Sequence, residues 1–422
     1  MAHTMDRTLA EVRRDLHRHP ESGWREFRTT ALIAEELDKR GFNTHLGADA
    51  VNTDSRMGVP PEAEIEGAIE RASTEGADDE YLDRMDGITG LVAVKMYGDG
   101  TGPVVGLRID MDALDRSEAQ DDEHRPAREG FASIHPDEMH ACGHDGHTTI
   151  GLGTARRLDD GDEFDGTIKL FFQPAEEGSR GGKSMSETDH LRDVDHLLAV
   201  HLGLNLDTGT VIAARERPLS NARVDVIYEG APAHAGKHPE QGRNSLQALS
   251  TAIQNLYAIP RHSDGGTRIN VGMVHSDNAQ NTISERATMR FEVRGNTPEL
   301  TEYMLDSAER IVDAAAEMHD VGVSTSMWGR AISYEADDSM VQLLTDVARD
   351  TDGVENVIER QEAGGSEDAS YLISRVQDYG GTATYVGIGA SNPAGHHTAY
   401  FDIDEDALEL GVDVVTNAIQ RL

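Results

Sequence analysis

The spacing of hydrophobic and polar positions predicts an α/β arrangement in the first half of the chain. Apolar residues recur at helical spacing over 9–17 and 28–40, and Gly41 is placed to end the second helix. Short, β-branched apolar runs predict buried strands at 91–96, 104–109, 168–172 and 197–200. A further helix is expected over 148–158, whereas 49–86 is polar, Gly-rich and acidic and is predicted to be a surface insertion.

The pattern changes between residues 217 and 330. The elements expected there, in chain order, are a strand, a helix, two strands, a helix and a strand, at 224–228, 245–258, 268–274, 288–294, 298–318 and 321–327. Thr297 as N-cap and Pro298 at the first helical position mark the start of the second helix. This β-α-β-β-α-β order is typical of a ferredoxin-like unit.

After the insert the chain returns to α/β character. A helix is expected near 340–348, a strand at 382–388 and a closing helix at 405–422. We therefore predict a layered α/β domain made of 1–216 and 331–422, into which a ferredoxin-like domain of residues 217–330 is inserted.

The charge of the chain limits its partners and its environment. Its 422 residues include 77 acidic and 38 basic ones, only five of them lysine, for a formal net charge of -39. Nucleic acid is an unfavourable partner for such a surface. Molar salt reduces the Debye length to about 3 Å, so the charge and the scarcity of lysine favour a salt-saturated cytoplasm. The single cysteine excludes an internal disulfide, and no signal peptide or membrane-length apolar run is expected.

The candidate chemistry is concentrated in residues 139–147, where the only cysteine lies among three histidines and an aspartate. Cys142 and His144 can converge on one metal ion if the backbone bends at Gly143. The alternative is that Cys142 is a small buried residue. That alternative must also account for the acidic stretch 173–178 and for His201, which follow predicted strands, and for His397 before residues 398–401. Acidic residues and histidines that follow strands lie where open α/β sheets assemble their sites.

Several ungapped motifs occur in a fixed order along the chain. They are HPESGW at 19–24, RIDMDALD at 108–115, HACGHDGHT at 140–148, QPAEEG at 173–178, AHAG at 233–236, GSED at 365–368 and GHH at 395–397. Together with the ferredoxin-like insert, they make the chain resemble the M20 family of metallopeptidases and amidohydrolases over nearly its whole length. The likeness is greatest to the branch of hippurate and auxin-conjugate amidohydrolases.

The resemblance implies a di-metal site. It assigns two divalent ions to five ligands, with Glu176 as the general base; the ligands are Cys142, His144, Glu177, His201 and His397. Two such ions polarise a scissile carbonyl and activate water, and a carboxylate beside the metals can move a proton from that water to the leaving amine. The ligand types suit manganese, zinc and cobalt about equally.

Other residues near these motifs have weaker claims. Asp112 is expected to orient a ligand histidine, although an aspartate after a strand is also an ordinary turn former, and the same holds for Asp110. The resemblance makes no use of His140 or His147, which are expected not to bind metal. His17, His19 and Trp24 are expected to serve packing, and Glu367 and Asp368 to cap a helix or assist catalysis.

In the insert, the resemblance implies that Asn281 and Arg294 hold the α-carboxylate of the substrate and that His234 reaches the reacting carbonyl from the other chain of a dimer. An arginine fork suits a carboxylate, but Arg294 can equally be a solvated strand residue. The turn that begins at Asn281 lacks the proline common in the family, which leaves the reach of Asn281 open.

The resemblance thus predicts a di-metal amidohydrolase that cleaves an N-acyl or N-aroyl amino acid, with a substrate of the aminobenzoyl-glutamate type favoured, and the composition predicts a cytoplasmic location. A dipeptidase or carboxypeptidase on the same scaffold is the alternative enzyme. The insert would serve as a lid and dimerisation domain, in a homodimer or in a pair with a related subunit. A chain that is inactive without its partner is the alternative from another class, although every expected ligand and the base are present.

Overall fold

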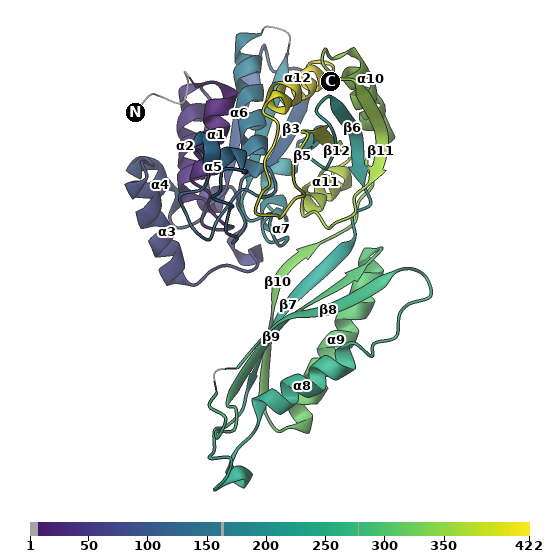
Figure 1. The fold of residues 1–422 in the computed structure, drawn as a ribbon. Coiled ribbons are helices and arrows are strands. Elements are labelled where there is room, and N and C mark those ends of the chain that lie inside the picture. The colour runs from purple at the N-terminus through teal and green to yellow at the C-terminus, as the bar shows by residue number, and fades with distance from the viewer. Residues whose placement is uncertain (1–6, 162–163, 277) are drawn as a thin grey trace. The chain divides into compact units, whose positions relative to one another are not determined.

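The structure is a computed structural model that describes residues 7–161, 164–276 and 278–422 (Figure 1). The chain forms two compact units. Unit 1 comprises Met1–Glu216, Tyr334–Ala363 and Asp368–Leu422, and unit 2 comprises Arg217–Ser333 and Gly364–Glu367. Unit 2 contains all of the predicted insertion. It also contains 331–333 and 364–367, which the predicted boundaries place in the other domain.

Unit 1 is built on a mixed sheet of eight strands, whose four central strands are parallel. Across the sheet the strands are β1 (Asn43–Leu46), β2 (Leu91–Tyr97), β4 (Gly166–Gln173), β3 (Val104–Asp110), β5 (His196–Gly203), β12 (Thr382–Gly389), β6 (Thr210–Glu216) and β11 (Asn356–Glu362). β4, β3, β5 and β12 run parallel to one another. β2 pairs antiparallel with both β1 and β4, and β6 pairs antiparallel with β12. The carboxyl ends of the four central strands therefore meet at one edge of the sheet.

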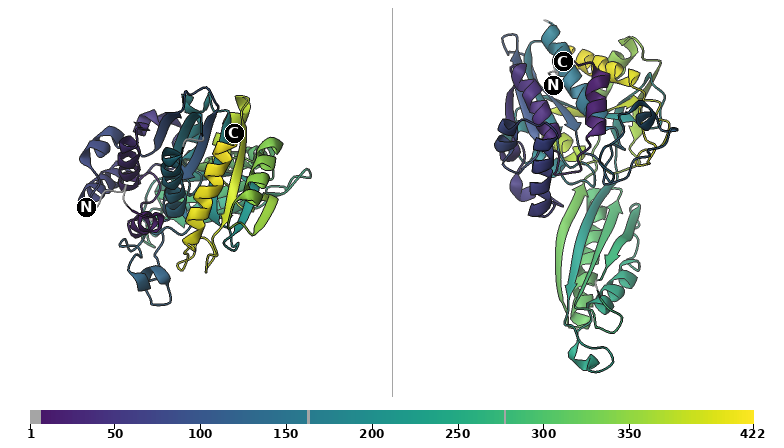
Figure 2. Two further views of the ribbon diagram at one scale, coloured as in Figure 1. Left: turned by 90° about the horizontal axis from the view of Figure 1, so that it is seen from above. Right: turned by 60° about the vertical axis from the view of Figure 1, so that its left-hand side comes forward.

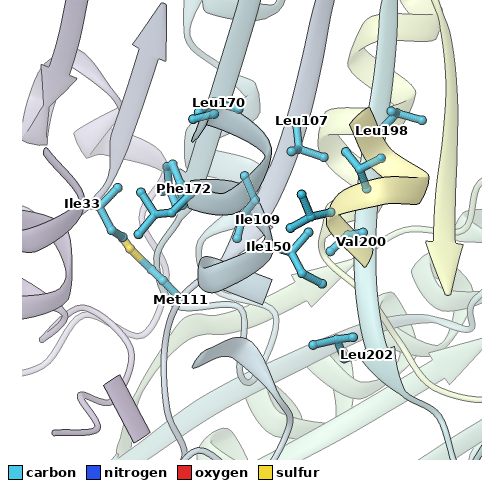
Figure 3. Packing of buried hydrophobic residues seen from close by; sticks show 14 of the residues in the cluster. Ile33, Leu107, Ile109, Met111, Ile150, Leu170, Phe172, Leu198, Val200 and Leu202 are labelled. Atoms are coloured by element: carbon cyan, nitrogen blue, oxygen red, sulfur yellow. The ribbon is translucent and has the colours of Figure 1, made fainter. Parts of the chain in front are cut away.

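Successive strand residues point to opposite sides of a sheet, and in this sheet the residues on both sides are buried. In β5, Leu198, Val200 and Leu202 belong to one apolar cluster, whereas Leu197 and Ala199 belong to another. Figure 3 shows the first cluster, with residues of β3, β4 and β5 packed against Ile33 and Ile150. The helices that cover this face include α1 (Leu9–Arg18), α2 (Phe27–Lys39), α6 (His144–Asp160), α10 (Asp338–Asp350) and α12 (Asp406–Gln420).

The other face of the sheet packs against α7 (Gly182–Ser186) and α11 (Ala369–Asp378). The unit is therefore a three-layer α/β/α fold, as predicted. α6 and α12 lie side by side along the sheet (Figure 2). None of the described helices combines the length and the apolar character that a membrane crossing needs.

The segment 49–86 is more than the surface insertion that its polar sequence predicted. It contains α3 (Glu62–Thr74) and α4 (Asp79–Met85). Ala50, Val51 and Met85 are fully buried in the core, and the Trp24 indole donates a hydrogen bond to the Met57 carbonyl at 2.8 Å. The segment is thus partly integrated into unit 1.

Unit 2 has the predicted ferredoxin-like order of elements. Its elements are β7 (Ser220–Glu229), α8 (Ser245–Leu256), β8 (Thr267–His275), β9 (Arg286–Gly295), α9 (Pro298–Met318) and β10 (Gly322–Ala331). The strands form an antiparallel sheet in the order β10-β7-β9-β8, and α8 and α9 pack together on one face of it (Figure 1). Thr297 caps α9 by accepting the Leu300 amide, as predicted.

Candidate active site

The candidate site lies in unit 1 where the central strands end. Asp112 follows β3, the Glu176–Glu177 pair follows β4, His201 lies near the end of β5 and His397 follows β12. Cys142 and His144 reach the same place from the loop that enters α6. Parallel strands bring their carboxyl ends to one edge, so residues from five distant parts of the chain converge.

All five predicted ligands are brought together. The ligand atoms of Cys142, His144 and His201 lie within 4.8 Å of one another, and so do those of Cys142, Glu177 and His397. His144, Glu176 and Glu177 form a third such group. Because the first two groups share Cys142, the arrangement offers two adjacent metal positions rather than one.

Asp112 connects the glutamate pair to His144. Its carboxylate accepts the backbone N–H of Glu176 at 3.1 Å and of Glu177 at 2.9 Å. Its carbonyl oxygen lies 2.8 Å from Nδ1 of His144, and its Oδ1 lies 3.2 Å from the same atom. One buried aspartate thus fixes the backbone of the candidate base and the orientation of a candidate ligand.

The histidine tautomers suit metal binding. A carbonyl oxygen only accepts, so Nδ1 of His144 carries a proton toward Asp112, and Nδ1 of His201 carries one toward the Leu202 carbonyl at 2.9 Å. In both rings this leaves Nε2 as the atom that can donate an electron pair to a metal ion once it carries no proton. Nε2 of His144 is buried and lies 3.8 Å from Asp110, and Oε1 of Glu177 is buried and lies 3.3 Å from Nε2 of His397. A ring nitrogen and carboxylate oxygens held within 4.8 Å of one another in the group of His144, Glu176 and Glu177 fit a bound cation.

The electrostatics of the cluster also favour a cation. The hydrogen bond to Cys142, followed by that to Glu177, raises the pKa of His397 to about 10. Burial opposes charge on His144, but Asp110 and Cys142 outweigh it and raise its pKa well above the usual range. The pKa of His201 lies well below its ordinary value because burial disfavours its charged form. The anionic groups thus stabilise positive charge here, while His201 remains a neutral ligand.

The backbone around the site has positive φ angles, which residues other than glycine usually avoid. Gly143 has φ 89° at the start of α6, while Ala175 and His397 have φ 51° and 60°. The Ala175 amide donates to the buried carboxylate of Glu26 at 2.7 Å, and the His397 amide donates to the Ala141 carbonyl at 2.7 Å. Strain of this kind persists where the surroundings hold it, and it concentrates at functional sites.

His147 is engaged as a structural residue. Its Nδ1 contacts Asp110, and its Nε2 accepts the Leu202 amide at 2.8 Å. Asp110 in turn pairs with Arg108 at 2.6 Å. His140 is buried, and burial lowers its pKa to about 3. Neither histidine belongs to a group with Cys142 or Glu177, although His147 also lies near His144 and Asp110.

His17 is completely buried, but it does more than pack. Its Nδ1 lies 2.8 Å from Asp145, and its Nε2 lies 2.9 Å from Glu118, which also contacts His124 at 2.7 Å. Arg13 pairs with Asp145 at 2.7 Å. This buried network ties α1 to the first turn of α6.

Two buried carboxylates position backbone segments of the site. Glu26 precedes α2 and belongs to none of the sequence motifs, so sequence reasoning missed it, whereas the role of Asp368 was left open. Asp368 begins α11 without making a capping bond; instead it accepts the amides of Gly181 and Gly182 at 3.1 and 2.7 Å. Arg108 also contacts Asp368, at 3.3 Å. Asp368 therefore supports the loop that follows the glutamate pair.

The three substrate-binding candidates of unit 2 do not form one group within the chain. His234 pairs with Thr282 in an isolated bridge, which places His234 beside the turn that begins at Asn281. Both residues are exposed and lie near the Arg286 end of β9. Arg294 lies at the other end of β9. It is eight residues from Arg286, which corresponds to about 27 Å along the strand at about 3.4 Å per residue. One chain therefore cannot bring Asn281 and Arg294 to the same carboxylate.

Comparisons with known proteins agree with this geometry. The family model "Peptidase family M20/M25/M40" matches residues 106–421. The chain is 43% identical over 410 residues to one of the subunits of the p-aminobenzoyl-glutamate hydrolase of Escherichia coli (strain K12), covering 96% of this chain and 94% of that one. It is 42% identical to the indole-3-acetyl-aspartic acid hydrolase of Enterobacter agglomerans, with the same coverage.

The fold also matches a solved relative. The crystal structure of an aminobenzoyl-glutamate utilization protein from Klebsiella pneumoniae superposes with a TM-score of 0.85 at 34% sequence identity, covering 98% of this chain and 95% of that one. Likeness of sequence and fold thus extends over both units. The chain belongs to peptidase family M20/M25/M40 and is a hydrolase of amide bonds.

Proposed function

We propose that the protein is a di-metal amidohydrolase that cleaves the amide bond of an N-acyl or N-aroyl amino acid. The observation that carries this proposal is the pair of ligand groups that share Cys142, with Glu176 in contact range of His144 and Glu177. Cys142, His144, Glu177, His201 and His397 would hold two divalent ions, manganese, zinc or cobalt. A substrate of the aminobenzoyl-glutamate type is favoured, because relatives above 40% identity carry that name and an acyl-aspartate name.

When bound, two divalent ions would polarise the scissile carbonyl and ease deprotonation of the attacking water. Glu176 takes a proton from that water as the water oxygen attacks the carbonyl carbon. It then gives the proton to the amine nitrogen as the C–N bond breaks, yielding a carboxylate and a free amino acid. Asp112 holds the Glu176 amide, so the base is positioned before the substrate arrives. The two neighbouring glutamates thus have separate roles, as base and as ligand.

We propose that the complete site takes residues from two chains. His234 and Asn281 lie at one end of the unit 2 sheet and Arg294 at the other. We therefore propose that Arg294 and the His234–Asn281 pair of one chain serve two different substrate molecules, so that a partner chain contributes to each site. The partner is a second copy or a related chain, since two relatives are named as single subunits of a hydrolase.

The acidic composition supports a salt-rich cytoplasm as the working environment. A net charge of -39 opposes compaction in dilute buffer, and molar salt removes most of that repulsion. Activity should therefore be assayed at high salt.

Release of amino acids from a panel of N-acyl and N-aroyl substrates tests the proposal. Chelation should abolish hydrolysis, added manganese, cobalt or zinc should restore it, and elemental analysis should find two ions per chain in the active protein. Full activity in rigorously metal-free protein, or release limited to unblocked dipeptides, would contradict the proposal.

A further inference from the structure

The polar face of the unit 2 sheet has an unusual charge balance. This face is the side of β7, β8 and β9 that points away from α8 and α9. Near its Arg294 end the charged side chains are Arg223, Asp225, Arg268, Arg290, Glu292 and Arg294. Arginines outnumber carboxylates there two to one, whereas the whole chain has 77 acidic and 38 basic residues. A solvated face of this acidic protein would show the opposite balance, so the excess indicates an anionic ligand.

Both carboxylates on this part of the face are already paired. Asp225 binds Arg290 through two contacts of 2.6 and 2.8 Å. Glu292 binds Arg223 at 2.7 Å and Arg294 at 2.5 Å. Arg268 is exposed and has no hydrogen bond or ion pair within residues 7–161, 164–276 and 278–422.

Strand register places Arg268 directly opposite Arg294. Directly opposite residues in antiparallel strands point to the same face, with Cβ atoms about 4.5–5.5 Å apart. Like charges in this position destabilise a sheet unless an anion lies between them. The Nη1 atom of Arg294 makes no hydrogen bond to the described residues, since Glu292 takes only Nε and Nη2. Two guanidinium groups are therefore available side by side.

Asn221 completes the same row. It lies opposite Arg294 on β7, and its Oδ1 accepts the Ala331 amide at 2.8 Å. Its Nδ2 is a buried donor without a hydrogen-bond partner among the described residues, as is Nη1 of Arg223. Buried unpaired donors are costly and are commonly satisfied by water or by a ligand. This end of the face thus lacks acceptor oxygens.

We infer that Arg268 is a specificity-determining residue that binds the side-chain carboxylate of an aspartate or glutamate moiety whose α-carboxylate is bound by Arg294. The two carboxylates of such a moiety are joined by a short aliphatic chain and match the spacing of two opposite strand residues. The inference rests on the proposed function and narrows it to amides of dicarboxylic amino acids. It assigns this recognition to a residue that none of the sequence motifs contains.

The test compares two substrates that differ in one charge: an N-aroyl glutamate and the same N-aroyl glutamine. Wild type, Arg268→Gln, Arg268→Lys and the control Arg310→Gln are assayed as metal-loaded full-length protein at one fixed high salt concentration. Arg310 is an exposed arginine of α9, on the helical side of unit 2, so its loss removes the same charge elsewhere.

Arg268→Gln should lower kcat/KM for the glutamate substrate by about 10- to 100-fold, the size expected for a hydrogen bond to a charged group. It should change the glutamine substrate little, Arg268→Lys should keep part of the preference, and Arg310→Gln should match wild type. An equal loss on both substrates, or no loss on either, would overturn the inference. If wild type cleaves both equally well, the inference fails but the proposed function stands; if it cleaves neither under any metal, the proposed function itself fails.

Discussion

The carboxyl edge of the unit 1 sheet and the polar face of the unit 2 sheet carry the functional candidates in opposite ways. At the edge, four of the five candidate ligands are buried and only His397 is exposed, while Asp112 and backbone carbonyls orient His144, Glu177 and His201. On the unit 2 side, His234, Asn281 and Arg268 are exposed. Chemistry that must be the same in every turnover is built into a rigid core, whereas recognition uses side chains that substrate can reach.

The largest expected effect tests the division of labour within the rigid site. Glu176→Gln should reduce turnover by about 10³-fold or more, because the proton carrier is lost. Its metal content should not change, since the ligands remain. Glu177→Gln should lose activity together with bound metal. Elemental analysis beside single-turnover rates distinguishes the two variants.

Asp112→Asn is the matched control for this experiment. It keeps the size of the residue that holds both glutamate amides and His144, but removes its charge. It should give an intermediate loss of activity with partial loss of metal. Equal metal loss in the Glu176 and Glu177 variants would mean that base and ligand have been assigned the wrong way round.

The next expected effect concerns the exposed side of the comparison. His234→Ala and Glu176→Gln should each be inactive, but mixing them should restore about a quarter of wild-type activity. Random pairing makes half of the dimers hybrid, and each hybrid has one intact site. Exchange of chains between dimers, followed with two affinity tags, provides the control. Exchange without recovery would show that His234 acts within its own chain or only supports the fold.

A smaller and graded effect is expected from salt. Carboxylates on the surface repel one another in dilute buffer, and the free energy of unfolding is a small difference between large terms. The melting temperature should therefore rise steadily between about 0.1 and 3 M KCl as screening increases. A curve measured in parallel for a homologue of ordinary charge gives the comparison. A flat or falling curve would show that the acidic surface is not an adaptation to salt.

The sequence predicted the central strands because these are local signals, whereas the ligand set came from the resemblance and stays a prediction. β3, β4 and β5 are short apolar runs, and the ligands lie in motifs near their ends. It did not predict β11, because this edge strand is half-exposed and carries charged residues, and so lacks a clear apolar pattern. β6 is buried along its whole length and shows no alternation that would mark it as a strand.

The motifs could not predict which residues become neighbours through the register of strand pairing. The resemblance grouped Asn281 with Arg294, but Asn281 lies in the turn before β9 and Arg294 lies at the far end of that strand. Conversely, Arg268 and Arg294 are distant in sequence and become neighbours only through the pairing of β8 with β9. Glu26 and Asp368 act through backbone amides of other segments, and hydrogen bonds of this kind leave no compositional trace.

The position of β12 in the sheet sets the order in which the site can be assembled during synthesis. This strand lies between β5 and β6, yet it is the last strand of the chain to be made. A nascent chain that ends before residue 382 has no strand to fill that gap, and it also lacks His397. Metal loading should therefore be confined to finished chains, and long-range strand insertion of this kind makes the final folding step slow. A ribosome-released fragment would retain Cys142, His144 and Glu177 but could not close the second metal position.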